Sequence, residues 1–132
     1  MLENPYLPAA DDLHSIGSLT FAYVGDAVLE LLYRTKHVSE GLRTVDKLHK
    51  KNVLAVSAKA QAVFAQKIAP HLTEDELSVF SRGKNAKSAN IPKNATQHDY
   101  RVATAVEALF GYLYLKGKTD RILELFDLGE KP

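Results

Sequence analysis

Asp26 and Glu107 are the residues of this chain whose setting most clearly calls for chemistry, because each carboxylate stands in a long apolar segment. Asp26 lies in LTFAYVGDAVLELLYR (19–34), and Glu107 lies in AVEALFGYLYL (105–115). An ionised carboxylate in such surroundings carries a high desolvation cost unless a cation or a hydrogen-bond donor meets it. No Lys or Arg lies within one helical turn of Asp26, so we expect a metal ion, another cation or a partner side chain there. A hydrogen bond from a neighbouring helix cap is the purely structural alternative.

Small residues beside both carboxylates predict that the two segments approach each other closely. Gly25 precedes Asp26, and Gly111 follows Glu107 by one helical turn. Because glycine lets another backbone come near, two crossing helices could direct both carboxylates to one point. Two carboxylates, water and a phosphate oxygen make the octahedral oxygen set that Mg²⁺ prefers. We therefore predict that Asp26 and Glu107 bind Mg²⁺, for which Mn²⁺ could substitute.

For Glu30 and Glu107, an ion pair with a nearby basic residue is the alternative to binding a metal ion. Glu30 lies one turn after Asp26 and is a third candidate metal ligand, whereas an i,i+4 pair with Arg34 would give it a structural role. A buried salt bridge with Arg101 or a lysine is the structural alternative for Glu107.

A basic, polar stretch occupies residues 81–96, and no acidic residue lies between Glu76 and Asp99. Lys and Arg side chains can bind phosphates, and amide and hydroxyl side chains can bind 2′-hydroxyl groups. This combination suits the shallow minor groove of A-form RNA. The stretch lacks aromatic side chains for stacking on unpaired bases, so we expect duplex RNA; a flexible surface loop is the alternative. The candidate RNA-binding residues here are Arg82, Lys84, Asn85, Lys87, Ser88 and Lys93. A second candidate cluster, for which solvation is the alternative, comprises Lys47, His49, Lys50 and Lys51.

The formal net charge of +1 conceals a division along the chain. Residues 1–40 carry two basic and six acidic residues, residues 41–98 carry ten and four, and residues 99–132 carry five and six. The net charges of these segments are therefore −4, +6 and −1. A basic middle between acidic flanks predicts one surface that faces a polyanion; a solvated, lysine-rich helix face is the alternative.

Size and composition are those of a globular protein without a membrane span. The chain has 132 residues, of which 45% are hydrophobic, enough for one domain with its own core. It has no cysteine, which excludes disulfides and cysteine-based zinc sites, and no apolar run of about eighteen residues. The N-terminal MLENPYLPAADDL is acidic and interrupted by proline, unlike a signal peptide. We expect a cytoplasmic protein without a membrane partner.

Helical periodicity recurs along the chain, and no segment alternates as a strand would. Residues 1–14 are predicted to be an irregular lead-in because Pro5 and Pro8 interrupt them. The first long helix is expected to run from Leu19 to Arg34, with Ser15 or Ser18 as its cap.

Thr44 is predicted to cap a helix that continues in helical spacing to Ile68, with a break near Lys51-Asn52 and a stop at Pro70. A short helix is predicted to begin at the Thr73–Glu76 capping box and to be ended or kinked by Gly83, and a loop follows over residues 84–97. A second long apolar helix is expected from His98 to Leu115. Thr119 is predicted to cap a final amphipathic helix that stops near Gly129. This pattern predicts an all-α fold in one domain covering residues 1–132.

Five blocks of sequence occur in the order and spacing of one known family. They are YVGDAVLELL (23–32), LHKK (48–51), VSAKAQA (56–62), RGKNAKS (82–88) and EALFGYL (107–113). Together they resemble Mini-ribonuclease III, the short bacterial branch of the ribonuclease III family, over residues 19–115. The resemblance implies a ribonuclease III-type nuclease domain, a helical bundle with two long central helices, and no separate double-stranded-RNA-binding domain.

The resemblance also carries expectations about activity. It assigns Asp26 and Glu107 to the family's metal site and implies metal-dependent endonucleolytic cleavage of double-stranded RNA that leaves 5′-phosphate and 3′-hydroxyl ends. It implies a homodimer, a bacterial cytoplasmic location, and maturation of the precursor of 23S ribosomal RNA, with a ribosomal protein as a helper. The side of the first helix that carries Leu19 and Tyr23 agrees with a dimer, because it is more apolar than one small core requires.

Two departures from the longer family members concern the metal site. Those enzymes have further carboxylates at the positions of Ala22 and Thr104, so the number of metal ions per site stays open. The thinned site favours one alternative function, a non-catalytic RNA-binding or ribosome-assembly module on the same scaffold.

A second alternative is a metal-dependent phosphohydrolase of the HD class, which the dipeptide His98-Asp99 would allow. Such a site would also need His49 or His71, together with Asp120, on converging helices. It would leave the setting of Asp26 and Glu107 unexplained.

Overall fold

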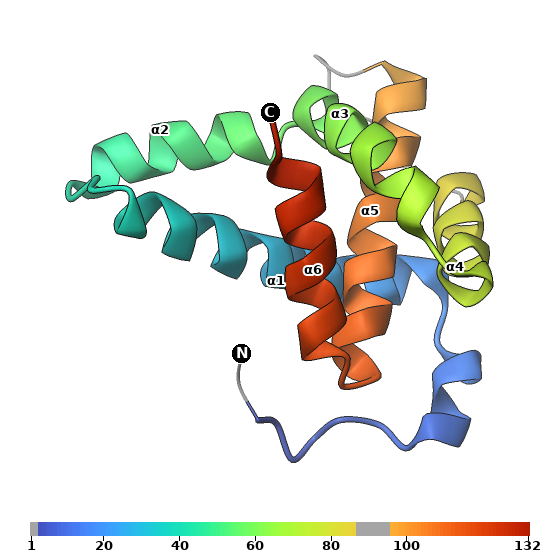
Figure 1. Cartoon of the computed structure of the whole chain (residues 1–132). Helices are drawn as coiled ribbons and strands as arrows, with labels where there is room; N and C mark the ends of the chain where they lie inside the picture. The colour runs from blue at the N-terminus through green and yellow to red at the C-terminus, as the bar shows by residue number, and fades with distance from the viewer. Residues whose placement is uncertain (1–2, 87–95) are drawn as a thin grey trace.

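The structure, a computed structural model, describes residues 3–86 and 96–132, which form helices joined by short connections (Figure 1). The described residues contain no strand, so the predicted all-α fold is confirmed. In chain order the elements are the 3-10 helix η1 (Ala10–Ser15), α1 (Ser18–Ser39), α2 (Val45–Ala55), α3 (Ala58–Ile68), the 3-10 turn η2 (Ala69–His71), α4 (Glu74–Asn85), α5 (Gln97–Leu115) and α6 (Thr119–Glu130).

Most helices begin where a hydroxyl side chain can accept a hydrogen bond from the first turn. Thr44 caps α2 through the backbone N–H of Lys47, as predicted. Thr73 and Glu76 form the predicted capping box at the start of α4. The first long helix differs, because α1 begins after Gly17 without a side-chain cap and continues to Ser39.

Ser57, not the polar pair Lys51-Asn52, separates the two middle helices. The side chain of Ser57 accepts a hydrogen bond from the N–H of Ala60 and starts α3, while α2 ends at Ala55. The predicted break was therefore misplaced by about one turn. The cause is local, since a serine cap offers the backbone an alternative to continuing the helix.

Two glycines near the ends of predicted helices serve helix packing. A Cβ at Gly83 would lie 2.9 Å from the Cβ of Ala108, so Gly83 allows α4 to pack on α5 and the helix continues to Asn85. Gly129 lies within α6, where a Cβ would meet the ring of Phe64. Gly83 therefore does not end its helix, whereas α6 ends at Glu130, one residue after Gly129, as predicted.

The remaining corrections are small. Thr119 is the first residue of α6, and Lys118 occupies the cap position. The lead-in is not wholly irregular, because residues 10–15 form η1 and bury Leu13. The predicted loop begins later than expected, since Asn85 still belongs to α4. The second long helix agrees with the prediction apart from starting at Gln97.

Helix α5 is the centre of the fold, and α1, α3, α4 and α6 all pack against it (Figure 1). Its buried residues run almost continuously from Val102 to Leu113. The largest fully buried side chains come from four helices and are Leu29, Ile68, Val106, Leu109, Phe110, Ile122 and Leu125. A helix buried on nearly all sides agrees with its all-round apolar sequence.

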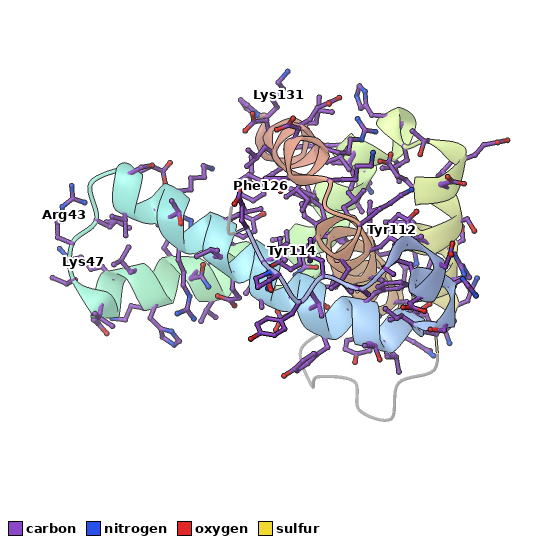
Figure 2. All side chains as sticks on the ribbon, turned by 90° about the horizontal axis from the view of Figure 1, so that it is seen from below. Arg43, Lys47, Tyr112, Tyr114, Phe126 and Lys131 are labelled. Atoms are coloured by element: carbon purple, nitrogen blue, oxygen red, sulfur yellow. The ribbon has the colours of Figure 1, made fainter. Side chains whose placement is uncertain are left out.

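The C-terminal part of α1 and the helix α2 extend away from the remaining helices as an arm (Figure 1). We define the arm as residues 31–55. The chain reverses at its tip, where Gly41 adopts a φ of 103° that favours glycine. Arg43 and Lys47 lie at this tip (Figure 2). Among the described residues, no helix has both the length and the apolar character needed to cross a membrane.

Candidate functional site

Helices α1 and α5 cross with their backbones in direct contact. A Cβ at Gly25 would lie 1.6 Å from the carbonyl oxygen of Glu107, and a Cβ at Gly111 would lie 1.8 Å from that of Phe21. Only glycine fits at either position, because a real Cβ never approaches a backbone atom so closely. The close approach predicted from these two glycines is therefore present.

The crossing brings the carboxyl groups of Asp26 and Glu107 together. They are close enough to share a hydrogen bond when one of them is protonated. Asp26 is exposed, whereas Glu107 is half-buried. Among residues 3–86 and 96–132, the partner of Asp26 is thus another carboxyl group and not a helix cap. Among the described residues, no Lys or Arg forms a salt bridge with Glu107, so the alternative pairing with Arg101 is absent.

Burial and neighbouring negative charge make Glu107 a weak acid. Desolvation is the largest cause, followed by the hydrogen bond with Asp26 and by the charges of Asp26 and Glu30, and together they raise the pKa of Glu107 to about 8. Two carboxylates that repel each other in a partly dry setting are stabilised by a shared cation. Mg²⁺ is commonly held by one or two carboxylates while it keeps several waters, so the pair fits this ion. The described residues contain no group of three or more His, Asp or Glu that could hold a metal.

Glu30 is held by side chains from two helices. Its carboxylate accepts a hydrogen bond from Arg34 Nε at 3.1 Å and another from Asn52 Nδ2 on α2. The i,i+4 pair with Arg34, considered from the sequence, is therefore present. Sequence reasoning missed Asn52, because the approach of α2 to α1 is needed to place that amide beside the carboxylate.

The two positions at which longer family members carry further carboxylates are buried and contribute no ligand. Ala22 is apolar, and the hydroxyl of Thr104 donates to the backbone carbonyl of Tyr100 at 3.0 Å. The HD alternative is not assembled either, since the described residues do not gather His98 and Asp99 with another His or Asp into a metal-binding group.

The candidate RNA-binding residues come from two separate elements. Arg82, Lys84 and Asn85 lie in the last turn of α4, whereas Lys87, Ser88 and Lys93 lie outside the described residues. In the arm, Lys47 and His49 are exposed on α2. The other two cations of that cluster are already paired, Lys50 with Asp46 at 3.2 Å and Lys51 with Glu40 at 3.0 Å.

Comparison with known proteins places the chain in a family. A family model described as the Ribonuclease III domain matches residues 19–118. A protein named Mini-ribonuclease 3 from Clostridium tetani (strain Massachusetts / E88) is 45% identical over 118 residues, which are 89% of this chain and 78% of that protein. The Mini-ribonuclease 3 of Brevibacillus brevis is 49% identical over 107 residues, which are 81% of this chain and 80% of that protein.

A solved structure agrees with these sequence matches. A crystal structure of a Fusobacterium nucleatum protein is similar with a TM-score of 0.79 and 32% identity, over 88% of this chain and 93% of that chain. The chain belongs to the ribonuclease III family, because the family model matches it over residues 19–118. Within that family, its curated relatives place it in the Mini-ribonuclease III branch, which confirms the resemblance found in the sequence.

Proposed function

We propose that this protein is a metal-dependent endoribonuclease that cleaves double-stranded RNA, with Asp26 and Glu107 as its metal-binding residues. One observation carries the proposal: two carboxyl groups from the crossing helices α1 and α5 meet in a partly buried site. Membership of the ribonuclease III family supports the same activity.

Each carboxylate has a distinct part in this proposal. Half-buried Glu107, anchored on the central helix, fixes one metal position, and exposed Asp26 leaves the site open toward solvent and substrate. A bound Mg²⁺ would activate a water for attack on a phosphodiester and stabilise the departing 3′ oxygen, giving 5′-phosphate and 3′-hydroxyl ends. Glu30, already held by Arg34 and Asn52, would add negative charge beside the ion and is the third candidate ligand.

The cationic residues of α4 and the arm would hold the RNA through its phosphates. Arg82 and Asn85 are exposed at the end of α4, where the basic stretch begins. Lys47 is exposed at the arm tip (Figure 2). Because such contacts carry no base information, this surface would recognise a duplex by its backbone.

We further propose that the enzyme acts as a homodimer formed through α1. Tyr23 and Leu31 are 81% and 48% exposed. They line an apolar cavity of about 430 Å³ that also includes Val24, Val28, Tyr114 and the metal-site residue Asp26. Exposed apolar surface of this kind favours a protein partner. Leu19 and Tyr23, which lie on a side of this helix predicted to be apolar, both face solvent, whereas Ala22 and Tyr33 are buried.

The precursor of 23S ribosomal RNA is the proposed natural substrate, with a ribosomal protein as a helper and Mn²⁺ as a substitute metal. A bacterial cytoplasmic location belongs to the same proposal. These finer assignments rest on the family resemblance alone.

One assay tests the proposal. The protein is incubated with a long RNA duplex, with Mg²⁺ and with EDTA, and the fragment ends are identified. We expect cleavage only with Mg²⁺, and loss of cleavage in Asp26→Asn and Glu107→Gln with RNA binding retained. Duplex binding without any cleavage would instead favour the non-catalytic RNA-binding module. The absence of carboxylates at Ala22 and Thr104 is the observation that supports this alternative.

A further inference from the structure

We propose that Asn52 is a positioning residue that raises the affinity of the metal site for a divalent cation. It does so by holding the carboxylate of Glu30 beside Asp26 and Glu107. The inference rests on the proposed function and deepens it, because it makes cation affinity depend on how the arm is packed. Asn52 lies near the end of α2, which runs beside the C-terminal part of α1 (Figure 1).

The charge of Glu30 belongs to the electrostatic surroundings of the carboxyl pair. Glu30 follows Asp26 by four residues in α1, and residues four apart share one face of a helix. Burial and Asp26 raise the pKa of Glu107 most, and the negative charge of Glu30 adds to their effect. Glu30 and Glu107 are therefore within electrostatic reach of each other. A third negative charge at this range increases the attraction of the site for a divalent cation.

Two donors hold Glu30 through the same carboxylate oxygen. Oε2 accepts one hydrogen bond from Arg34 Nε at 3.1 Å and another from Asn52 Nδ2. Among the described residues nothing donates to Oε1 of Glu30. This second oxygen is thus available to a metal ion or to a metal-bound water, because Mg²⁺ binds oxygen ligands and keeps several waters.

Of the two donors, Asn52 has the better fixed position. The side chain of Arg34 is 68% exposed, whereas Asn52 is 6% exposed. A long exposed side chain has many rotamers, so Arg34 alone does not hold the carboxylate in one place. Arg34 also follows Glu30 by one turn, on the side away from Asp26. Without Asn52, the carboxylate of Glu30 would be free to follow Arg34 away from the carboxyl pair.

Stability alone does not explain an amide at position 52. The Oδ1 atom of Asn52 is buried and has no donor among the described residues. A buried polar atom without a partner destabilises a fold, and an apolar side chain of similar size avoids that cost. Local features that cost stability are typical of functional sites. The hydrogen bond from Nδ2 to Glu30 is the part of this amide that serves the metal site.

The test measures binding of Mn²⁺ to the protein without RNA, from the electron paramagnetic resonance signal of the free ion. We expect the wild type to bind Mn²⁺ and Asp26→Asn to lose this binding. Asn52→Leu should bind Mn²⁺ about tenfold more weakly, which corresponds to 1.4 kcal/mol, yet should resist urea at least as well as the wild type. Asn52→Gln keeps the donor and has room in an adjoining cavity of about 310 Å³, so it should recover most of the affinity.

Two comparisons separate positioning from a general loosening of the arm. Glu30→Gln should itself bind Mn²⁺ more weakly, and adding Asn52→Leu to it should cause no further loss, because Asn52 acts through Glu30. Gln61→Leu is the matched control. Gln61 is also a buried amide whose oxygen lacks a described donor, but its Nε2 donates to the backbone carbonyl of Val56 at 3.2 Å. This control should keep the wild-type affinity for Mn²⁺.

The outcomes distinguish failure of the inference from failure of the proposed function. If Asp26→Asn abolishes Mn²⁺ binding but a folded Asn52→Leu binds the ion as tightly as the wild type, the inference is overturned. An equal loss of affinity in Gln61→Leu would also overturn it. If the wild type binds no Mn²⁺, or Asp26→Asn binds it equally well, the metal site of the proposed function fails and the inference fails with it. Asn52→Ala replaces Asn52→Leu if circular dichroism shows that the leucine variant is not folded.

Discussion

The α-carbon of Gly25 lies against the carbonyl group of Glu107, so one backbone contact sets both the crossing of the central helices and the position of the carboxyl pair. The residue after Gly25 is Asp26, and a Cβ at Gly25 would also lie 2.7 Å from the backbone nitrogen of Gly111. Any side chain at Gly25 must therefore separate α1 from α5 and, with them, Asp26 from Glu107.

This contact makes Gly25→Ala strongly destabilising. The added methyl group would overlap backbone atoms, which cannot move aside as a flexible side chain can, so we expect a loss above about 3 kcal/mol or failure to fold. Chemical denaturation followed by circular dichroism measures the loss. Gly17→Ala is the control, because nothing lies within 4 Å of a Cβ at that position. A stable, active Gly25→Ala protein would show that the helices need not touch at this point.

The pKa of Glu107 predicts an unusual pH dependence for the metal-free protein. Its value in the folded protein is about 8 against an ordinary 4.5, so between these values the folded state binds the proton that the unfolded state has lost. The free energy of unfolding should therefore fall as pH rises from about 4.5 to about 8. Glu107→Gln should remove this decline and be more stable than the wild type at pH 7.5 by at least about 1 kcal/mol.

Denaturation in EDTA at several pH values measures this effect. Adding Mg²⁺ should restore stability to the wild type at pH 8, because the metal replaces the proton, and should leave Glu107→Gln nearly unchanged. Parallel pH profiles of the two proteins in EDTA would contradict the prediction.

The ion pair between Glu76 and Arg121 predicts the opposite pH behaviour. Arg121 donates to both oxygens of the buried Glu76 carboxylate, at 2.8 and 2.9 Å, and these bonds are the main cause of its lowered pKa. The stabilisation should be complete above the ordinary pKa of 4.5 and be lost as pH falls through the lower value of the folded state. Glu76→Gln should cost about 3 kcal/mol at pH 7, since it removes the buried charge partner of Arg121 and leaves the guanidinium only the exposed Glu124 carboxylate and the His71 carbonyl.

A matched control is available on the same arginine. Glu124 also accepts from Arg121, at 2.7 Å, but its side chain is 61% exposed. Glu124→Gln should therefore cost less than about 1 kcal/mol. Urea denaturation measures the free energy of unfolding of both variants. Equal losses would show that burial of the pair between Glu76 and Arg121 does not increase its contribution to stability.

Local signals were sufficient to predict the helix starts at Thr44 and Thr73 and the meeting of Asp26 with Glu107. A cap is decided by residues within one turn, and the meeting follows from two apolar segments that each carry a glycine beside the carboxylate. Gly83 could not be interpreted correctly in this way, because a packing glycine and a terminating glycine look alike until the partner helix is known.

Asn52 illustrates the same limit for the candidate site. In the sequence it is a polar residue after three basic or titratable ones and indicates a helix break. Its burial and its contact with Glu30 depend on α2 folding back along α1. Long-range placement of that kind is not encoded in the spacing of residues within either helix.

Dimerisation through α1 predicts a clear effect of charge at Tyr23. Sedimentation of the wild type at micromolar concentration should give about twice the chain mass of 14.6 kDa. Tyr23→Lys should sediment as a monomer, because the interface would have to bury an unpaired ammonium group. Tyr6 is 90% exposed on the lead-in, so Tyr6→Lys should remain dimeric. A monomeric wild type would contradict the proposed homodimer.

The last prediction concerns the basic stretch of residues 81–96, which begins in the last turn of α4. If Lys84 and Lys87 contact phosphates, replacing both by alanine should weaken binding to all duplexes nearly alike. The slope of the logarithm of the binding constant against that of salt should fall by about one unit for each lost contact. Cleavage at saturating RNA should fall less than in Asp26→Asn, since the carboxyl pair is untouched.

Lys116→Ala is the control for loss of charge. Lys116 donates to the hydroxyl of Tyr112 at 3.0 Å and follows the last residue of α5. The basic stretch precedes the first turn of α5, so the length of this helix, roughly 27 Å, separates the two. Removal of Lys116 should leave the salt slope unchanged. The measurement is a salt titration of duplex binding in Ca²⁺. If the Lys84 and Lys87 variant matches the wild type in affinity and slope, the cations of the arm become the principal phosphate contacts, and Lys47→Ala should then show the reduced slope instead.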